Sequence, residues 1–172
     1  MHPAGLPEEE LITDVEWETY RGPGPGGQHR NKTDSFVRVT HVPTGIRAQA
    51  GERRHRTENQ RQALIRLRHK LAVQHREPLP EPPGPVTVYE PSDLWKSRLT
   101  AGRVVVSVRH RDYPALLAEA LDVLAHCEDD AGSAAALLRI TTGQMIRFLK
   151  KTPAVLADLN ERRRRQGLKP YR

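Results

Sequence analysis

The chain has 172 residues, which is enough for one ordinary domain or two small ones, and its hydrophobic content of 37% supports modest cores. Its formal net charge of +7 at pH 7 favours a polyanionic partner. A single cysteine excludes an intramolecular disulfide and no apolar run approaches the length of a membrane span, so we expect a cytoplasmic protein with no membrane partner.

The charge is distributed unevenly along the chain. Residues 1–20 carry six acids and no lysine or arginine, whereas residues 21–76 carry thirteen bases against three acids. Residues 77–160 are mildly acidic, with nine bases and eleven acids, and residues 161–172 carry six bases and one acid. Two separate basic regions are the pattern expected of a protein that docks on nucleic acid at defined surfaces.

Residues 1–10 are expected to form a flexible leader before a first domain that spans residues 11–76. Asp14–Tyr20 alternates apolar and acidic side chains, which is the period-two pattern of a strand. The strand leads into residues 21–35, where four glycines and two prolines lie in and before the tripeptide Gly26-Gly27-Gln28. Glycine opens positive-φ conformations and proline limits the resulting disorder, so we expect a protruding loop with an exposed tip.

The tripeptide and its continuation through residues 29–46 resemble the catalytic loop of class-I peptide chain release factors and of the related codon-independent ribosome-rescue hydrolases. The resemblance implies hydrolysis of the ester that joins a nascent peptide to the P-site tRNA, with Gly26, Gly27 and Gln28 as catalytic residues. It also implies that large-subunit ribosomal RNA at the peptidyl transferase centre supplies the rest of the active site. The chain shows no catalytic triad, carboxylate pair or metal-ligand spacing, so no metal or other cofactor is expected.

The amide of Gln28 is too weakly basic to remove a proton. It would therefore position water, while its backbone N–H donates to the oxygen charge that develops in the transition state. A β-carbon at Gly26 or Gly27 would forbid the required backbone conformation or block entry into a tight RNA cavity. The family also implies a glutamine methyltransferase that modifies Gln28. An individual basic side chain on a protein surface is as often merely solvated. RNA contact is nevertheless predicted for the residues that flank the tripeptide: Arg21, His29, Arg30, Asn31, Lys32 and Thr33.

The rest of the first domain is predicted to be a small sheet packed on one long helix. Phe36–His41 and residues 46–50 predict two more strands, joined by a turn at residues 42–45. A capping box at residues 57–60 opens a helix to about His75, with a buried stripe at Leu64, Leu67 and Leu71 and outer bases at Arg61, Arg66, Arg68 and Lys70. The predicted fold class is α+β, like the catalytic domain of the family.

A proline-rich linker at residues 77–85 separates this domain from a mostly helical one at residues 86–160. Residues 104–108 form either a strand or a stretch packed on helices. Helices are predicted over residues 113–127, over residues 133–139, from a second capping box at residues 141–144 through Lys151, and from Pro153 to about Arg165.

Residues 134–149 allow two interpretations. Two short helices around a tight turn, with Gln144, Arg147 and Lys150 facing outward, resemble a helix-turn-helix. A small bundle with a solvated polar face is favoured, because residues 77–160 are net acidic. Residues 161–172 form a basic end, and the cations in it would also complement the dipole at the end of a helix. RNA contact is predicted for its basic residues: Arg162, Arg163, Arg164, Arg165, Lys169 and Arg172.

Two functions are consistent with these features. The first is a monomeric, codon-independent peptidyl-tRNA hydrolase that releases nascent chains from stalled ribosomes. Codon independence is expected because the residues before Asp14 are too few to hold a stop-codon-reading region. The second is a non-catalytic RNA- or ribosome-binding factor that acts through the helix-turn-helix-like C-terminal domain. The intact tripeptide favours the first.

Overall fold

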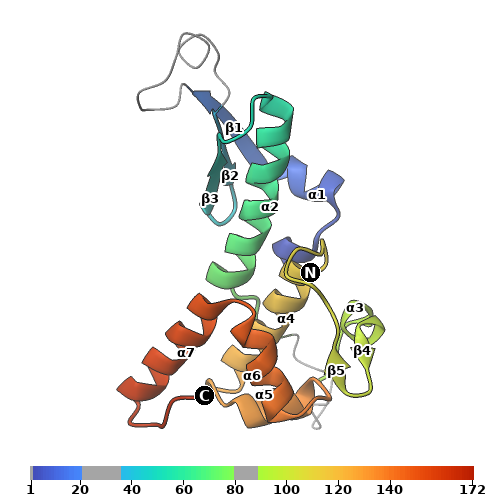
Figure 1. Cartoon of the computed structure of the whole chain (residues 1–172), viewed down its shortest axis with the longest axis vertical. Coiled ribbons are helices and arrows are strands. Elements are labelled where there is room, and N and C mark those ends of the chain that lie inside the picture. The colour runs from blue at the N-terminus through green and yellow to red at the C-terminus, as the bar shows by residue number, and fades with distance from the viewer. Residues whose placement is uncertain (1, 21–35, 80–88) are drawn as a thin grey trace. The chain divides into compact units, whose positions relative to one another are not determined.

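A computed structural model of the chain describes residues 2–20, 36–79 and 89–172 (Figure 1). The chain divides into two compact units, Met1–His75 and Arg76–Arg172. Its helices and small sheets are compatible with the predicted α+β class. Most of the predicted linker, residues 77–85, lies outside the described residues, so the proposed domain boundaries stay a prediction.

The N-terminal unit contains a three-stranded antiparallel sheet in the order β1-β2-β3. The strands are β1 (Val15–Tyr20), β2 (Phe36–His41) and β3 (Arg47–Ala50), and helix α2 (Arg56–Gln74) packs on β2 and β3. Period-two burial in β2 and β3 turns one face of the sheet toward the helix. The core between them contains Val37, Val39, Ala48, Ala50, Ala63, Leu64, Leu67 and Leu71.

The expectation of a flexible leader over residues 1–10 is wrong. The described residues 2–10 contain the 3₁₀-helix η1 (Pro3–Gly5) and the start of helix α1 (Glu8–Thr13), and Ala4 and Leu11 are buried. The guanidinium of Arg68 donates to the backbone oxygens of Ala4 at 3.1 Å and Leu6 at 2.7 Å. Arg68 was expected on the outer face of its helix, but it is half-buried because it holds the N-terminal segment to α2.

The start of α2 also differs from the expected capping box at residues 57–60. The helix begins at Arg56 after His55, which makes no side-chain cap. The preceding loop is held by the buried side chain of Asn59, which accepts from the Arg53 N–H and donates to the Arg53 carbonyl, both at 2.9 Å. An amide can make this reciprocal pair with one backbone residue because it carries both a donor and an acceptor.

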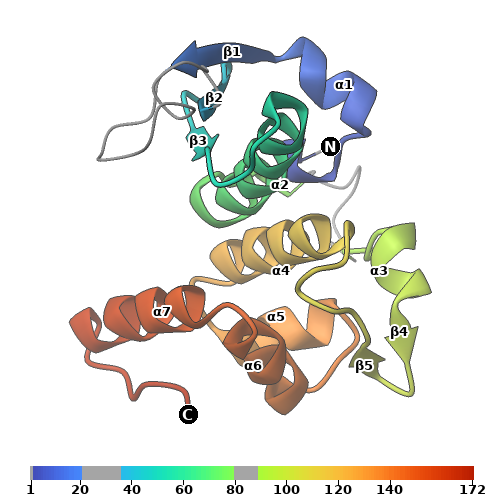
Figure 2. The same cartoon turned by 45° about the horizontal axis from the view of Figure 1, so that its top comes forward.

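The C-terminal unit is mostly helical, and Figure 2 shows how its helices pack beside one another. Its elements are α3 (Asp93–Ser97), β4 (Leu99–Thr100), β5 (Arg103–Val104), α4 (Tyr113–His126), α5 (Ala131–Leu137), α6 (Thr142–Lys150) and α7 (Pro153–Arg165). The core is centred on α4, in which ten of the fourteen residues are buried. Of residues 104–108, only Val104 is in a strand, while Val106 packs inward and Val105 and Val108 are exposed.

Two of the predicted helix starts have different outcomes. The Thr141 hydroxyl accepts from the Gln144 N–H at 3.2 Å, which confirms a side-chain cap at the start of α6. Thr152 precedes Pro153 at the start of α7 as predicted but makes no side-chain cap; its hydroxyl is hydrogen-bonded to the Tyr113 hydroxyl at 2.8 Å.

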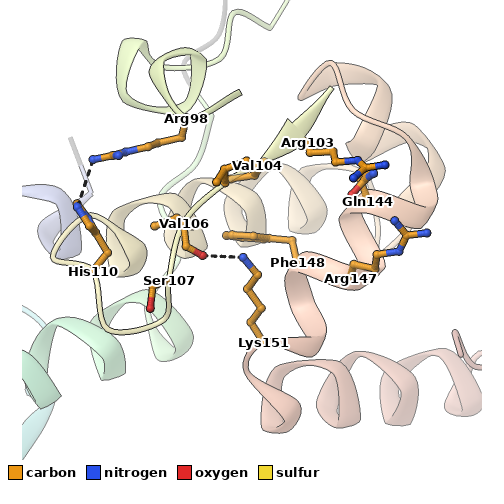
Figure 3. A pocket seen from close by; sticks show the side chains of 11 residues that line it. Arg98, Arg103, Val104, Val106, Ser107, His110, Gln144, Arg147, Phe148 and Lys151 are labelled. Atoms are coloured by element: carbon orange, nitrogen blue, oxygen red, sulfur yellow. Dashed lines mark hydrogen bonds between the residues drawn. The ribbon is translucent and has the colours of Figure 1, made fainter. Parts of the chain in front are cut away.

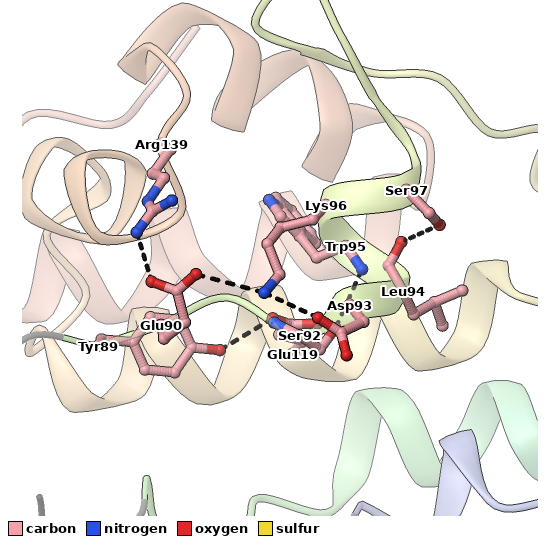
Figure 4. Close-up of polar contacts among 10 residues, drawn as sticks. All are labelled: Tyr89, Glu90, Ser92, Asp93, Leu94, Trp95, Lys96, Ser97, Glu119 and Arg139. Carbon is pink, nitrogen blue, oxygen red and sulfur yellow. Dashed lines mark hydrogen bonds and ion pairs between the residues drawn. The ribbon is translucent and has the colours of Figure 1, made fainter.

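A polar network joins α3 to α4 in this unit (Figure 4). The Glu119 carboxylate accepts from the Tyr89 hydroxyl at 2.9 Å and from the Ser92 hydroxyl at 2.5 Å, while Ser92 caps α3. Burial, together with the nearby Glu119 carboxylate, raises the pKa of Tyr89. Trp95 is completely buried on α3, and its Nε1–H donates to the Leu138 carbonyl at 3.0 Å. Helix α3 is therefore attached to both α4 and the end of α5.

Within the described ranges, none of the helices has both the length and the hydropathy needed to cross a lipid bilayer.

Candidate catalytic loop and its anchor

Strands β1 and β2 determine where the glycine-rich segment leaves the sheet. They are antiparallel neighbours, and their register pairs Tyr20 with Phe36. Residues 21–35 therefore connect two directly paired positions at one end of the sheet. The predicted catalytic residues Gly26, Gly27 and Gln28 fall in this connection, outside the described residues. The same holds for Arg21, His29, Arg30, Asn31, Lys32 and Thr33.

Side chains around the two strand ends form what we call the loop anchor: Tyr20, Phe36, Arg38, Gln49 and Gly51. The rings of Tyr20 and Phe36 lie 5.7 Å apart between centroids, and the Tyr20 hydroxyl donates to Gln49 Oε1 at 2.9 Å. The Arg38 guanidinium lies 5.1 Å from the centroid of the Tyr20 ring and pairs with Glu18 at 3.2 Å. All three strands therefore contribute to holding the ends of the connection.

Gly51 follows β3 directly and provides the space that the Phe36 ring occupies. A β-carbon built on Gly51 would overlap three carbon atoms of that ring. The φ angle of Gly51 is not in the positive range, so the requirement is for space alone. Sequence reasoning missed the loop anchor, because the contact between Gly51 and Phe36 follows from strand pairing. The aromatic residues at both ends of residues 21–35 were the signal available.

The Gly51→Ala variant is expected to destabilise the N-terminal unit by about 1–3 kcal/mol, the usual range for overpacking. It should also slow any reaction that depends on residues 21–35, because Phe36 must move away from its place beside Tyr20. Thermal melting and peptide release measured on the same preparation would test both effects. Gly143→Ala is the matched control, since a β-carbon there meets nothing within 4 Å. A Gly51→Ala protein with wild-type stability and release would contradict this account.

Two of the bases predicted on the outer face of α2 are engaged with β3 and the residues that follow it. The Arg66 guanidinium donates to the Gln49 carbonyl at 2.7 Å and pairs with Glu52 at 2.5 Å. The Lys70 ammonium donates to the Arg47 carbonyl at 2.7 Å. A hydrogen bond from the Gly51 N–H, with a smaller contribution from Arg66, lowers the pKa of Glu52. These contacts support the fold around the loop anchor.

The predicted RNA-binding arginines of the basic end differ in their surroundings. Arg162 makes two contacts with the mostly buried Asp129 carboxylate, at 2.6 and 3.0 Å, and also pairs with Asp158. The hydrogen bond to Asp129 raises the pKa of Arg162. Arg163 stacks on the Tyr171 ring at 3.9 Å and donates to the Lys169 carbonyl at 3.0 Å. Both side chains hold the end of α7 to its own unit.

The other four predicted residues of this end are exposed: Arg164, Arg165, Lys169 and Arg172. Arg164 and Arg165 both pair with Glu161 on the same helix, at 3.5 and 3.3 Å. Exposed pairs of this kind are worth little and exchange readily for another anion. RNA contact by the basic end stays a prediction, and these four side chains are the ones available for it.

Metal chemistry has no candidate site in the described part of the chain, where no three His, Cys, Asp or Glu side chains come together. The single cysteine, Cys127, lies half-buried at the C-terminal cap of α4, and burial raises the pKa of its thiol.

Part of the chain is similar to known proteins. Residues 9–83 match the family model of the RF-1 domain. "Peptide chain release factor 1" of Malacoplasma penetrans is 38% identical over 112 residues, which cover 63% of this chain and 29% of that protein. "Peptide chain release factor 2" of Caulobacter sp. is 47% identical over 68 residues, which cover 38% of this chain and 18% of that protein.

A "Peptide chain release factor 2" of Acidovorax sp. is 52% identical over 59 residues, which cover 34% of this chain and 16% of that protein. The chain thus spans less than a third of the length of these relatives. The matched residues include the whole connection between β1 and β2. The RF-1 domain and the release factor 1 and 2 relatives support the class-I peptide chain release factor family for this chain.

Proposed function

We propose that this chain catalyses ribosome-dependent hydrolysis of the peptidyl-tRNA ester and so releases nascent chains. One observation carries the proposal: Gly26-Gly27-Gln28 lies in the connection between β1 and β2, inside the residues that match the RF-1 domain. The relatives named above are peptide chain release factors, which supports the same reaction class. The large-subunit RNA and the P-site tRNA are the partners that the reaction requires.

The chemistry assigned to the tripeptide is positioning and charge stabilisation. In this proposal the Gln28 N–H donates to the oxyanion of the tetrahedral intermediate, and the side chain orients the attacking water at the ester carbon. Neither group needs to ionise. Gly26 and Gly27 let the backbone approach the tRNA end without a β-carbon in the way. Modification of Gln28 by a glutamine methyltransferase would retain the backbone donor.

The loop anchor explains how a small domain could deliver this segment with precision. Catalytic groups act best when rigid elements carry them, and a misplacement of about 1 Å can cost about 100-fold in rate. The contacts of Tyr20 with Phe36 and Gln49 hold the strand ends that carry the connection. Arg38 adds a cation–π contact on the Tyr20 ring.

The finer proposal is codon-independent rescue of stalled ribosomes by a monomer. It rests on the resemblance of residues 26–46 to the catalytic loop that release factors share with codon-independent rescue hydrolases. Peptide release should therefore proceed at similar rates on ribosomes with a stop codon, a sense codon or no codon in the A site. Release from programmed ribosomes that hold labelled peptidyl-tRNA would measure this. A strong preference for stop codons would refute rescue while leaving hydrolysis intact.

A second candidate function is that of a non-catalytic RNA- or ribosome-binding factor. It is favoured by α5 and α6, two short helices joined by a tight turn, with the exposed Arg147 on the second helix. This candidate requires that the purified protein binds ribosomes and releases no peptide from them, with or without an empty A site.

A further inference from the structure

The C-terminal unit contains a cavity of about 610 Å³ between β5, the segment that follows it, and α6 (Figure 3). Its walls combine aliphatic side chains with cations, and none of its lining residues is an acid. We call it the basic pocket and define it by the basic and amide side chains of its lining: Arg98, Arg103, His110, Gln144, Arg147 and Lys151.

The basic pocket brings together two basic stretches that are far apart in the sequence. Between Asp93 and Asp112 there are five lysines or arginines and no acid, and between Asp130 and Asp158 there are four and no acid. From Asp112 to Asp130 the chain carries six acids and no lysine or arginine. The small net charge of residues 77–160 therefore conceals a local positive surface. This removes the reason given above for interpreting residues 134–149 as a small bundle with a solvated polar face.

Two of the pocket cations are available to a ligand. Arg103 and Arg147 are exposed, and neither pairs with a carboxylate anywhere in the described ranges. The other two are already held: the Lys151 ammonium donates to the Val106 carbonyl at 2.7 Å, and Arg98 pairs with Asp112. Arg98 Nε is also buried without a hydrogen-bond partner. The unbalanced charge of the pocket thus rests mainly on Arg103 and Arg147.

Helix α6 presents its polar lining along one stripe. Gln144, Arg147 and Lys151 are spaced three and four residues apart, and such residues share a helix face. Figure 3 shows Arg103 reaching toward the same side from β5. The Thr141 cap and the tight turn from α5 fix the start of this helix. The stripe is therefore presented on a supported element rather than on a loose loop.

We propose that the basic pocket binds the phosphate backbone of RNA, with Arg103 and Arg147 as the principal phosphate ligands and Gln144 as a neighbouring hydrogen-bond donor. A guanidinium offers a planar pair of donors that matches phosphate oxygens. The pocket's aromatic ring, Phe148, is only 2% exposed, so it offers no platform for a base. Recognition should therefore follow phosphates and salt concentration rather than sequence. The proposal goes beyond the hydrolytic role and does not depend on it.

The test uses the full chain and a short fluorescent RNA hairpin, titrated at several salt concentrations. The double variant Arg103→Gln/Arg147→Gln should bind about tenfold more weakly near physiological salt, and the slope of log K against log salt should fall by about 1.5. The control Arg109→Gln/Arg111→Gln removes the same charge from exposed residues of the same unit that do not line the pocket. The control should keep nearly the wild-type affinity and slope.

Three results would overturn the proposal. The first is wild-type RNA affinity and salt slope in the pocket variant. The second is equal weakening in both variants, which would mean that net charge rather than the pocket binds RNA. The third concerns an acidic peptide made of valine and glutamate. If the protein binds this peptide more tightly than RNA, and the pocket variant loses that binding, the pocket would be assigned to an acidic protein partner. Melting of both variants at the wild-type temperature would show that the fold is intact. Peptide release is measured in a separate assay, so that a failure of this proposal can be told apart from a failure of the hydrolytic role.

Discussion

Replacement of Gly27 by alanine is expected to reduce peptide release by about 100-fold or more, the scale seen when one preorganised oxyanion donor is lost. A β-carbon at this position would displace the Gln28 N–H and obstruct the approach of the backbone to the ester. The melting temperature should change little, because residues 26–28 contribute no large apolar side chain to a core. Single-turnover release at saturating protein would separate lost chemistry from lost binding.

The loss of peptide release is attributed to catalysis only if the same preparation still binds ribosomes with wild-type affinity. Gln28→Ala provides a comparison that removes the side chain but retains the backbone donor, so its loss should be smaller than that of Gly27→Ala. Release at the wild-type rate by the Gly27→Ala protein would exclude a catalytic role for the tripeptide. The non-catalytic binding function would then be the better account.

Trp95→Ala is expected to destabilise the C-terminal unit by about 3–5 kcal/mol, the usual range when a buried tryptophan is truncated. The Trp95 side chain has no exposed surface, its Nε1–H donates to the Leu138 carbonyl, and its ring lies nearly perpendicular to that of Phe148, with 5.7 Å between centroids. Loss of the ring removes support from both α3 and α6. Because Phe148 lines the basic pocket, RNA affinity should fall together with stability.

The control variant Trp95→Phe keeps an aromatic ring but leaves the Leu138 carbonyl without its donor, so its cost should be nearer 1–3 kcal/mol. The chain has two tryptophans, Trp17 in the N-terminal unit and Trp95 in the C-terminal one. Fluorescence melting of a Trp17→Phe protein follows the C-terminal unit through Trp95 alone. The Trp95 variants lack this reporter, so circular dichroism compares their melting. Trp95→Ala with an unchanged circular-dichroism melt would contradict the role assigned to this contact.

Local patterns in the sequence were sufficient for much of the fold. The strand at Phe36–His41 has the predicted bounds, and the last helix runs from Pro153 to Arg165 before Gly167 at a φ of 73°, as expected. Alternation, helical spacing, a proline at a helix start and a glycine beyond a helix end act over a few residues, so they can be recognised without neighbours. The tripeptide at residues 26–28 was recognisable for the same reason.

Long-range pairing decided the rest. Arg68 was expected to be solvated, but it is half-buried on the backbone of Ala4 and Leu6, more than sixty residues away in the sequence. Arg162 was expected to contact RNA, but Asp129, 33 residues earlier in the sequence, holds it. The sequence shows that a side chain is charged, but whether that charge meets a carboxylate, a carbonyl or solvent depends on which distant segment folds against it. By itself, the sequence determined many of the helices and strands and showed the tripeptide that we propose as catalytic, whereas only the tertiary structure decided which cations stabilise the fold and which surround the basic pocket.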